Sequence, residues 1–256
     1  MLQVDVLPWD SAFFGIGIAR IVPQRGTIEE LSATVEQAAR GGVACLYWLV
    51  GCDDAPSSRA AETCGFHLVD IRMTFEREVI PCATVNHADL PRVRPYAEGD
   101  LPALLALAGE SHRESRFFFD SNFAPERCSA MYAEWIRRSL RTATDTVLVA
   151  GIPGEPAGYC VTRVAAGQTG SIELIAVNPQ ARQAGVGTAL VSAALEQFAC
   201  SGVRRATVAT QGRNIASQRL YQRCGFLTKS VALWYHKWLT CGIATAERNV
   251  ELPDTL

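Results

Sequence analysis

The sequence lacks any long apolar run and any cluster of basic residues. No apolar stretch approaches the ~18 residues of a membrane-spanning helix, and Met1–Asp5 is acidic where a secretory signal would be basic. The 24 Lys and Arg residues form no long run and the net charge is −2, so a nucleic-acid-binding surface is not indicated. These absences favour a cytoplasmic protein that contacts neither a membrane nor nucleic acid.

The nine cysteines lack the spacing of a metal site or of a disulfide framework. The sequence has no Cys-x-x-Cys pair and no histidines at a matching spacing. Cys64 and Cys224, which each precede Gly-Phe, are expected to be buried small apolar residues. The four histidines show no pairing pattern, so each is expected to be a surface or structural residue. We therefore expect no metal and a reducing compartment.

With 256 residues, 48% of them apolar, the chain is long enough for one large or two small globular domains. Two prolines and Asn86-His87 mark a linker, which predicts an N-terminal domain over residues 1–79, a linker over 80–91, a second domain over 92–239 and a poorly ordered tail over 240–256. Helices are predicted over residues 28–40, 56–63, 100–109, 125–141, 187–200 and 214–223. Strands are predicted over residues 17–21, 43–50, 67–77, 93–96, 146–152, 157–165, 170–177, 204–210 and 231–238.

Turn and capping residues give further local expectations. Trp9–Gly15 is predicted to be a loop with aromatic anchors, and Asp100 is predicted to cap the helix that follows it. Pro125 suits the first turn of its helix, where a missing N–H costs nothing. Turns are predicted at Pro153-Gly154 and Gly167-Gln168.

The most informative motif is the glycine-bearing loop Arg182–Gly187, which follows a predicted strand and opens a predicted helix. Gly185 and Gly187 carry no Cβ, so the backbone can turn sharply and present N–H groups to an anion at the positive end of the helix. Alone this pattern is more often an ordinary tight turn, but its position between strand and helix predicts a pyrophosphate-binding cradle.

Residues 31–66 align without gaps on residues 191–226, with twelve identities in 36 positions. The alignment predicts a duplicated unit of helix, strand, helix and strand. The two copies differ where chemistry would occur, since Gly187 aligns with Thr27, Asn214 with Asp54 and Tyr221 with Ala61. The first copy is therefore expected to be a degenerate half-domain that serves packing or shapes an acceptor pocket.

The loop and the later Tyr221–Phe226 segment together resemble the two cofactor-binding motifs of the GNAT acetyltransferases. This resemblance implies an α/β (α+β) GNAT fold with a mixed, mostly antiparallel sheet flanked by helices, and acetyl-CoA as co-substrate. The implied contacts with acetyl-CoA come from Ile175, Ala176, Val177, Arg182, Gln183, Ala184, Gly185, Val186, Gly187, Thr188, Asn214 and Tyr221.

Acetyl transfer from a thioester to an amine needs a polarised carbonyl, a neutral amine and a proton for the departing thiolate. A backbone N–H near Ala176 and Val177 could polarise the carbonyl. Tyr221 lies two helical turns after Asn214 and could donate the proton, or it could pack in the core. Glu173 could be the general base, or an edge carboxylate that binds the substrate cation.

Four further segments, Leu7–Gly15, Ser115–Phe117, Met131–Ile136 and Val208–Gln211, make the chain similar to the TDP-4-amino-4,6-dideoxygalactose (TDP-fucosamine) N-acetyltransferases. In that family the tyrosine matched by Tyr221 is the proposed general acid. The acceptor of a GNAT enzyme enters beside its first two helices, which points here to a loop with the substrate-binding candidates Arg116, Phe117, Phe118 and Phe119. Arginines could pair with phosphates and the rings could stack on a base or sugar, although the phenylalanines could equally be core.

The sequence therefore predicts an acetyl-CoA-dependent N-acetyltransferase, with a nucleotide-linked amino-deoxy sugar of cell-surface polysaccharide biosynthesis as acceptor. One alternative is a GNAT enzyme that acts on a protein N-terminus or a small amine. The other is a non-catalytic module that binds acyl-CoA. The sequence is compatible with a homodimer and does not fix the oligomeric state.

Overall fold

A computed structural model describes residues 1–80, 90–165 and 169–239. The described residues form two compact units, one made of Met1–His67 with residues 235–239, the other of Leu68–Trp234. The predicted 80–91 linker, the Gly167-Gln168 turn and the 240–256 tail lie largely or wholly outside the described residues. The predicted domain boundaries stay predictions.

The first unit holds three strands and three helices. Strand β1 (Val4–Val6) pairs antiparallel with β2 (Ile18–Ile21), which pairs in parallel with β3 (Cys45–Gly51). The helices are α1 (Pro8–Phe14), α2 (Ile28–Arg40) and α3 (Ala55–Thr63). The loop predicted at Trp9–Gly15 is wrong, because Pro8 opens a helix there and Gly15, in the left-handed conformation, closes it.

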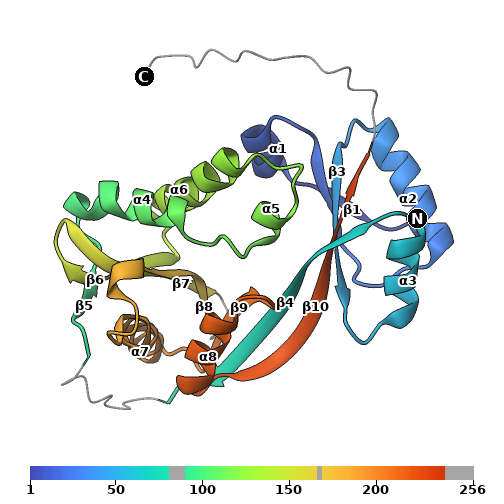
Figure 1. The fold of residues 1–256 in the computed structure, drawn as a ribbon. Coiled ribbons are helices and arrows are strands. Elements are labelled where there is room, and N and C mark those ends of the chain that lie inside the picture. Colours follow the sequence, from blue (N-terminus) through green and yellow to red (C-terminus); the bar gives the residue numbers. More distant parts are fainter. Residues whose placement is uncertain (81–89, 166–168, 240–256) are drawn as a thin grey trace, which may run out of the picture. The chain divides into compact units, whose positions relative to one another are not determined.

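The second unit is a sheet with helices on both faces (Figure 1). Its strands are ordered β10-β4-β9-β8-β7-β6-β5, and β8 and β9 are parallel whereas β4/β9, β8/β7, β7/β6 and β6/β5 are antiparallel. The strands are β4 (His67–Glu78), β5 (Val93–Pro95), β6 (Asp145–Ile152), β7 (Glu155–Ala165), β8 (Thr169–Val177), β9 (Arg205–Gln211) and β10 (Leu227–Trp238). The strand predicted over residues 231–238 thus begins four residues earlier.

Helices α4 (Leu101–Glu110) and α6 (Pro125–Arg141) cover one face of this sheet, and α7 (Val186–Cys200) covers the other (Figure 1). The remaining elements are η1 (Glu98–Asp100), α5 (Arg116–Phe119), η2 (Pro179–Ala181) and α8 (Ile215–Arg223). The core under α7 is built from fully buried side chains, among them Phe198, Leu190 and Phe75. Burying such side chains supplies the main stabilisation of the sheet that carries the site.

Two local predictions have opposite outcomes. Pro125 occupies the first turn of α6, as predicted. Asp100 does not cap α4 with its side chain, which corrects that expectation. Its fully buried carboxylate instead receives two hydrogen bonds from Arg94, at 2.7 and 2.8 Å, and one from the Gly154 N–H at 2.9 Å. A carboxylate is stabilised more by paired hydrogen bonds from a guanidinium than by a single hydrogen bond from a helix N–H.

The predicted duplication is matched element by element. The order α2, β3, α3, β4 recurs as α7, β9, α8, β10, and the bounds of the last three elements differ by 160 residues at both ends. The same order of elements therefore occurs twice along the chain.

Candidate active site

Two neighbouring strands diverge in the middle of the second unit. Strand β8 pairs with β9 only from Thr169 to Ile172, although β8 continues to Val177. Beyond Ile172 the inner edge of β8 no longer has β9 as its ladder partner. Such a divergence opens a crevice inside an otherwise continuous sheet.

A β-bulge at Glu173 accompanies the divergence. Ile172 lies opposite Thr162 and Leu174 opposite Val161, so Glu173 is one extra residue on β8. A bulge bends its strand and increases the local twist, which is a physical reason for β8 to leave β9 at this point. The bulge also interrupts the period-2 alternation that was expected to place Glu173 on one strand face with Ile175 and Val177.

Backbone N–H groups of β8 point into the crevice. The Asn178 N–H donates to the Ala157 carbonyl of β7 at 2.8 Å. Because amide directions alternate along a strand, the N–H groups of Ile175 and Val177 point away from β7, toward the side where β9 has diverged. Two of the residues expected to hold the thioester region thus present donors there, whereas the Ala176 N–H faces β7.

The first turn of α7 is open at its N-terminus. Gly185 is the N-cap residue with φ +77°, no side chain caps the helix, and no acidic residue lies in its first turn. Gln183 also has a positive φ of 66°. Uncapped N–H groups at the positive end of a helix bind anions, so the loop has the geometry of the predicted cradle.

A cavity of about 630 Å³, here called the cradle pocket, lies at this helix end. It includes the candidate residues Ile175, Ala176, Val177, Arg182, Gln183, Gly185, Val186, Gly187, Thr188 and Asn214. Its other lining residues come from Glu110–Glu114, from Ala181 and from Ala216, Ser217, Leu220 and Arg223 of α8. Ala184 and Tyr221, also predicted to contact acetyl-CoA, are not in its lining.

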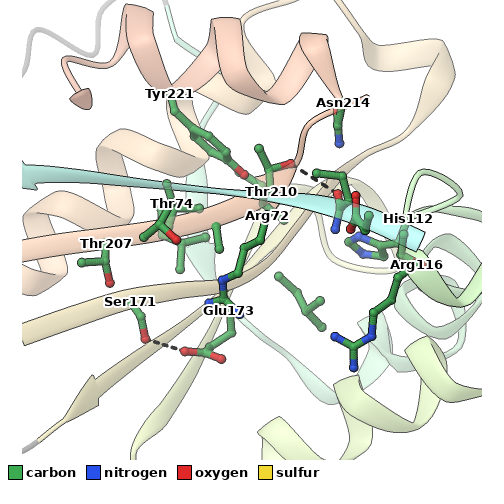
Figure 2. A pocket seen from close by; sticks show the side chains of 18 of the residues that line it. Arg72, Thr74, His112, Arg116, Ser171, Glu173, Thr207, Thr210, Asn214 and Tyr221 are labelled. Carbon is green, nitrogen blue, oxygen red and sulfur yellow. Dashed lines mark hydrogen bonds between the residues drawn. The ribbon is translucent and has the colours of Figure 1, made fainter. Parts of the chain in front are cut away.

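A second cavity of about 300 Å³, here called the sheet pocket, lies on the diverging strands (Figure 2). Its polar lining residues are Asp70, Arg72, Thr74, His112, Ser115, Arg116, Ser171, Glu173, Thr207, Thr210, Gln211, Asn214 and Tyr221. Its aromatic walls include Phe117, Tyr132, Trp135 and Trp234. His112, Ile175 and Asn214 line both cavities, so the two pockets meet where β8 leaves β9.

Tyr221 is a core residue that also lines the sheet pocket. Its ring packs against Phe75 and Phe226 at centroid distances of 5.9 and 6.1 Å, and the residue is only 2% exposed. The residue nevertheless lines the sheet pocket, and Figure 2 shows it on α8 together with Asn214. Burial raises the pKa of Tyr221, so the phenol keeps its proton at neutral pH.

Asn214 caps α8 as predicted, since its side chain accepts a hydrogen bond from the Ser217 N–H at 3.1 Å. This bond fixes the start of α8 next to the cradle. Asn214 is therefore a rigid part of the junction between the two pockets.

The Glu173 carboxylate is held by two neighbours. The Ser171 hydroxyl donates to one carboxylate oxygen, and the Arg163 guanidinium lies 3.3 Å from the other. Arg163 also forms two hydrogen bonds with Asp145, at 2.6 and 2.8 Å. The carboxylate thus has a fixed place in the sheet pocket.

The four candidates for acceptor binding separate in the structure. They lie on the short helix α5, not on the predicted loop. Arg116 and the 3%-exposed Phe117 line the sheet pocket, whereas Phe118 and Phe119 do not. The Phe118 ring stacks on Tyr132, and the exposed Phe119 ring lies under the Arg213 guanidinium. Phe117 belongs to the core and to the pocket wall at once.

Sequence reasoning missed several polar residues of this site, among them His112, Asp70 and Arg72. His112 was set aside with the other histidines, yet it lines both pockets, with its Nε2 2.8 Å from the Tyr159 hydroxyl oxygen. Burial lowers the pKa of His112 to about 4, so the ring is neutral at pH 7. Asp70 and Arg72 come from β4, whose alternating polar residues between apolar ones were a usable signal of a polar strand face.

Two classes of feature are absent from the described part of the chain. It contains no group of three or more His, Cys, Asp or Glu side chains arranged to hold a metal ion. None of its helices combines the length and the apolar character that crossing a bilayer requires.

Comparison with known proteins agrees with this geometry. Residues 109–226 match the model of the Acetyltransferase (GNAT) family. This range contains the diverging strands β8 and β9 and the helices α7 and α8. These residues form a GNAT acetyltransferase domain. Enzymes of this family generally use acetyl-CoA.

Two curated proteins and one solved structure extend this comparison. It is 27% identical over 237 residues to dTDP-fucosamine acetyltransferase of Escherichia coli O6:H1, covering 92% of this chain and 98% of that protein. It is 29% identical over 144 residues to the spore coat polysaccharide biosynthesis protein SpsD of Bacillus subtilis, covering 56% of this chain and half of SpsD. A GCN5-related N-acetyltransferase from Sphaerobacter thermophilus superimposes with a TM-score of 0.64 at 17% identity, covering 94% of this chain and 77% of that one. The predicted GNAT fold is confirmed.

Proposed function

We propose that this protein transfers the acetyl group of acetyl-CoA to the amine of a nucleotide-linked amino-deoxy sugar used for cell-surface polysaccharide. The acceptor class is supported by the two relatives, one a dTDP-fucosamine acetyltransferase and the other a spore coat polysaccharide biosynthesis protein. The observation that carries the proposal is the junction of two pockets at Ile175, His112 and Asn214. One pocket receives a pyrophosphate, and the other is polar enough for a sugar.

The donor binds with its diphosphate at the N-terminus of α7. The uncapped first turn and the lack of an acidic residue in it suit two negative charges. From there the thioester end reaches the crevice, where the N–H groups of Ile175 and Val177 polarise the carbonyl. One such hydrogen bond stabilises the developing oxyanion by about 3 kcal/mol.

Tyr221 supplies the proton for the leaving group. The acceptor amine forms the new C–N bond, the C–S bond of the tetrahedral intermediate breaks, and the Tyr221 hydroxyl protonates the thiolate. Burial raises the pKa of Tyr221, but the same low-polarity surroundings disfavour a thiolate as well, so the transfer stays feasible. The proton released by the amine balances the step and restores the phenol.

Glu173 faces the amine from the wall of the sheet pocket. Its carboxylate, fixed by Ser171 and Arg163, either binds the acceptor ammonium or takes its proton through water. A Glu173→Gln variant separates these roles. Loss of binding raises KM at constant kcat, whereas loss of a base lowers kcat, with a smaller loss at high pH where the amine is already neutral.

The decisive test is a panel of acceptors. Release of CoA should require a nucleotide-linked amino-deoxy sugar, and peptides with a free N-terminus or simple amines should be poor acceptors. Efficient turnover of the peptides, with none of the sugars, would overturn the acceptor assignment.

Tyr221→Phe tests the mechanism on the preferred acceptor. We expect kcat to fall by at least about tenfold while the Kd for acetyl-CoA stays unchanged, because the phenol acts only as the C–S bond breaks. Phe226→Leu, which trims the same ring cluster without touching the hydroxyl, is the control for packing. Unchanged turnover in Tyr221→Phe would remove the acid role.

A further inference from the structure

Arg72 is a half-buried cation with no hydrogen-bond or ion-pair partner among the described residues. It lies on β4 in the wall of the sheet pocket, and no described residue accepts a hydrogen bond from its guanidinium or forms an ion pair with it. Desolvation lowers the pKa of Arg72 and the positive charge of Arg116 lowers it further, whereas the negative charges of Glu173 and Asp70 raise it by less. A partly desolvated guanidinium without a hydrogen-bond partner is costly, so its presence in a pocket points to a ligand of opposite charge.

Arg116 stands near Arg72 and is held by aromatic rings. Its guanidinium lies 4.4 Å from the centroid of the Phe117 ring and 4.2 Å from that of Trp234. Stacking on rings limits the orientations of the guanidinium plane. Figure 2 shows Arg72 and Arg116 entering the pocket from different elements. An arginine immobilised before its ligand arrives loses little entropy on binding.

The carboxylates of the pocket are engaged elsewhere. Glu173 pairs with Arg163 and accepts from Ser171. Asp70 accepts the Ile71 N–H at 2.8 Å and lies 3.9 Å from Arg213. Neither comes within ion-pairing distance of Arg72, so neither carboxylate uses the N–H groups of its guanidinium.

We propose that Arg72 and Arg116 together form an anion subsite that binds a phosphate of the acceptor. The inference rests on the proposed function and deepens it. Guanidinium groups recognise phosphate with paired N–H donors, and two of them from different elements can grip two oxygens at once. The subsite fixes the sugar end of the acceptor so that its amine reaches the junction with the cradle pocket. Arg72 and Arg116 are therefore residues of specificity and not of proton transfer.

A binding experiment isolates the subsite from the cradle. Calorimetry is done with CoA at saturation, so that the cradle is occupied, and with deoxythymidine diphosphate or deoxythymidine as the probe. Arg72→Gln and Arg116→Gln should each weaken the binding of the diphosphate by at least about tenfold, because each removes one charge-assisted hydrogen bond. Deoxythymidine affinity should not change.

Arg137→Gln is the matched control. Arg137 lies on α6 in the same unit, paired with Glu134 at 3.3 Å and outside the sheet pocket. Unaltered diphosphate affinity in this variant shows that the effect is local. Equal loss in Arg137→Gln, or no loss in Arg72→Gln and Arg116→Gln, would overturn the inference. Both pocket variants must still bind acetyl-CoA normally, and a variant that does not has a folding defect. In that case Arg72→Lys is the milder substitution, and we expect it to change the logarithm of the diphosphate Kd by about half as much as Arg72→Gln.

Kinetics separate this inference from the proposed function. With a nucleotide amino sugar, Arg72→Gln should raise KM at least about tenfold, and with the same amino sugar lacking phosphate it should change nothing. If wild type turns over no nucleotide amino sugar but the diphosphate still binds through both arginines, the subsite stands and the acceptor assignment fails. If wild type turns over the sugar nucleotide and the arginine variants match it, the subsite fails and the function stands.

Discussion

Helices α2 and α7 open the two copies of the duplicated unit, and their first turns are built in opposite ways. At α2 the Thr27 side chain accepts from the Glu30 N–H, and the Glu30 carboxylate accepts from the Thr27 N–H at 3.0 Å. Glu29 adds a second carboxylate in the same turn. At α7 the N-cap is Gly185, with neither a side-chain cap nor an acidic residue.

This difference separates a structural helix end from a ligand-binding one. The capping box satisfies two N–H groups of α2 and places negative charge on its positive end, which repels an anion. The first turn of α7 leaves the same groups for a ligand. With Ala61 aligned to Tyr221, the first copy also lacks a proton donor at that position. We infer that the first copy is a degenerate half-domain that no longer binds a nucleotide.

The largest effect should follow from giving α7 the negative charge that α2 has. Gly185→Asp should weaken the binding of acetyl-CoA by at least about 100-fold, because charge repulsion adds to roughly 1–2 kcal/mol of strain at a positive φ. Gly202→Asp is the control, since Gly202 has φ +70° at the other end of α7 with open space around a Cβ. Calorimetric binding that survives in Gly185→Asp would refute the cradle.

Two aspartates sharpen the contrast between the units. Hydrogen bonds from Ser57 hold the pKa of Asp54 in the first unit below its usual range, whereas burial raises the pKa of Asp70 in the second unit to about 6. A raised carboxyl pKa means that the folded state loses stability as pH rises from about 4 to about 6. Asp70→Asn should therefore stabilise the protein by up to about 3 kcal/mol above pH 6 and by nothing at pH 4.

Urea unfolding of wild type and Asp70→Asn at pH 4 and at pH 7.5 measures this difference. Asp54→Asn serves as the comparison, because a lowered pKa predicts the opposite sign, a loss of stability that is greatest at neutral pH. A stabilisation by Asp70→Asn that is the same at both pH values would contradict the linkage.

The N-caps Asp54 and Asn214 occupy aligned positions, and both accept from a serine N–H three residues later. Replacing either by Ala should cost about 1 kcal/mol of stability. Only Asn214→Ala should also weaken the binding of acetyl-CoA. We expect a loss of roughly 3- to 10-fold, because one hydrogen bond is removed. Thermal unfolding and calorimetry test both halves, and equal binding by the two variants would show that Asn214 is a cap alone.

The smallest effect is expected at the capping box of α2. Thr27→Ala should cost about 1 kcal/mol of stability and leave kcat and the acetyl-CoA Kd unchanged. A change in kcat would mean that the first copy takes part in catalysis.

Features encoded locally were predictable. The cradle loop, the Asn214 cap and the Pro125 start follow from residue chemistry within a few positions, and the repeat is visible in the sequence itself. The Trp9–Gly15 error had a local remedy, because Pro at the first helical position and Gly after the last one mark a short helix.

Features that depend on pairing were not predictable. Arg72 enters the sheet pocket because β4 pairs with β9, with Arg72 opposite Gln211, and nothing near Arg72 in sequence states that register. The bulge at Glu173 likewise exists only as a mismatch between β7 and β8. His112 is neutral and half-buried, in contact with Tyr159 and Tyr132, which lie far away along the chain.

The bulge has a consequence for how such a crevice could arise or disappear. One surplus peptide unit in β8 both opens the strands and carries the carboxylate that faces the opening. Deleting Glu173 would let the ladder with β9 run on and would remove the acid in the same event. A single codon therefore accounts for both the crevice and its carboxylate.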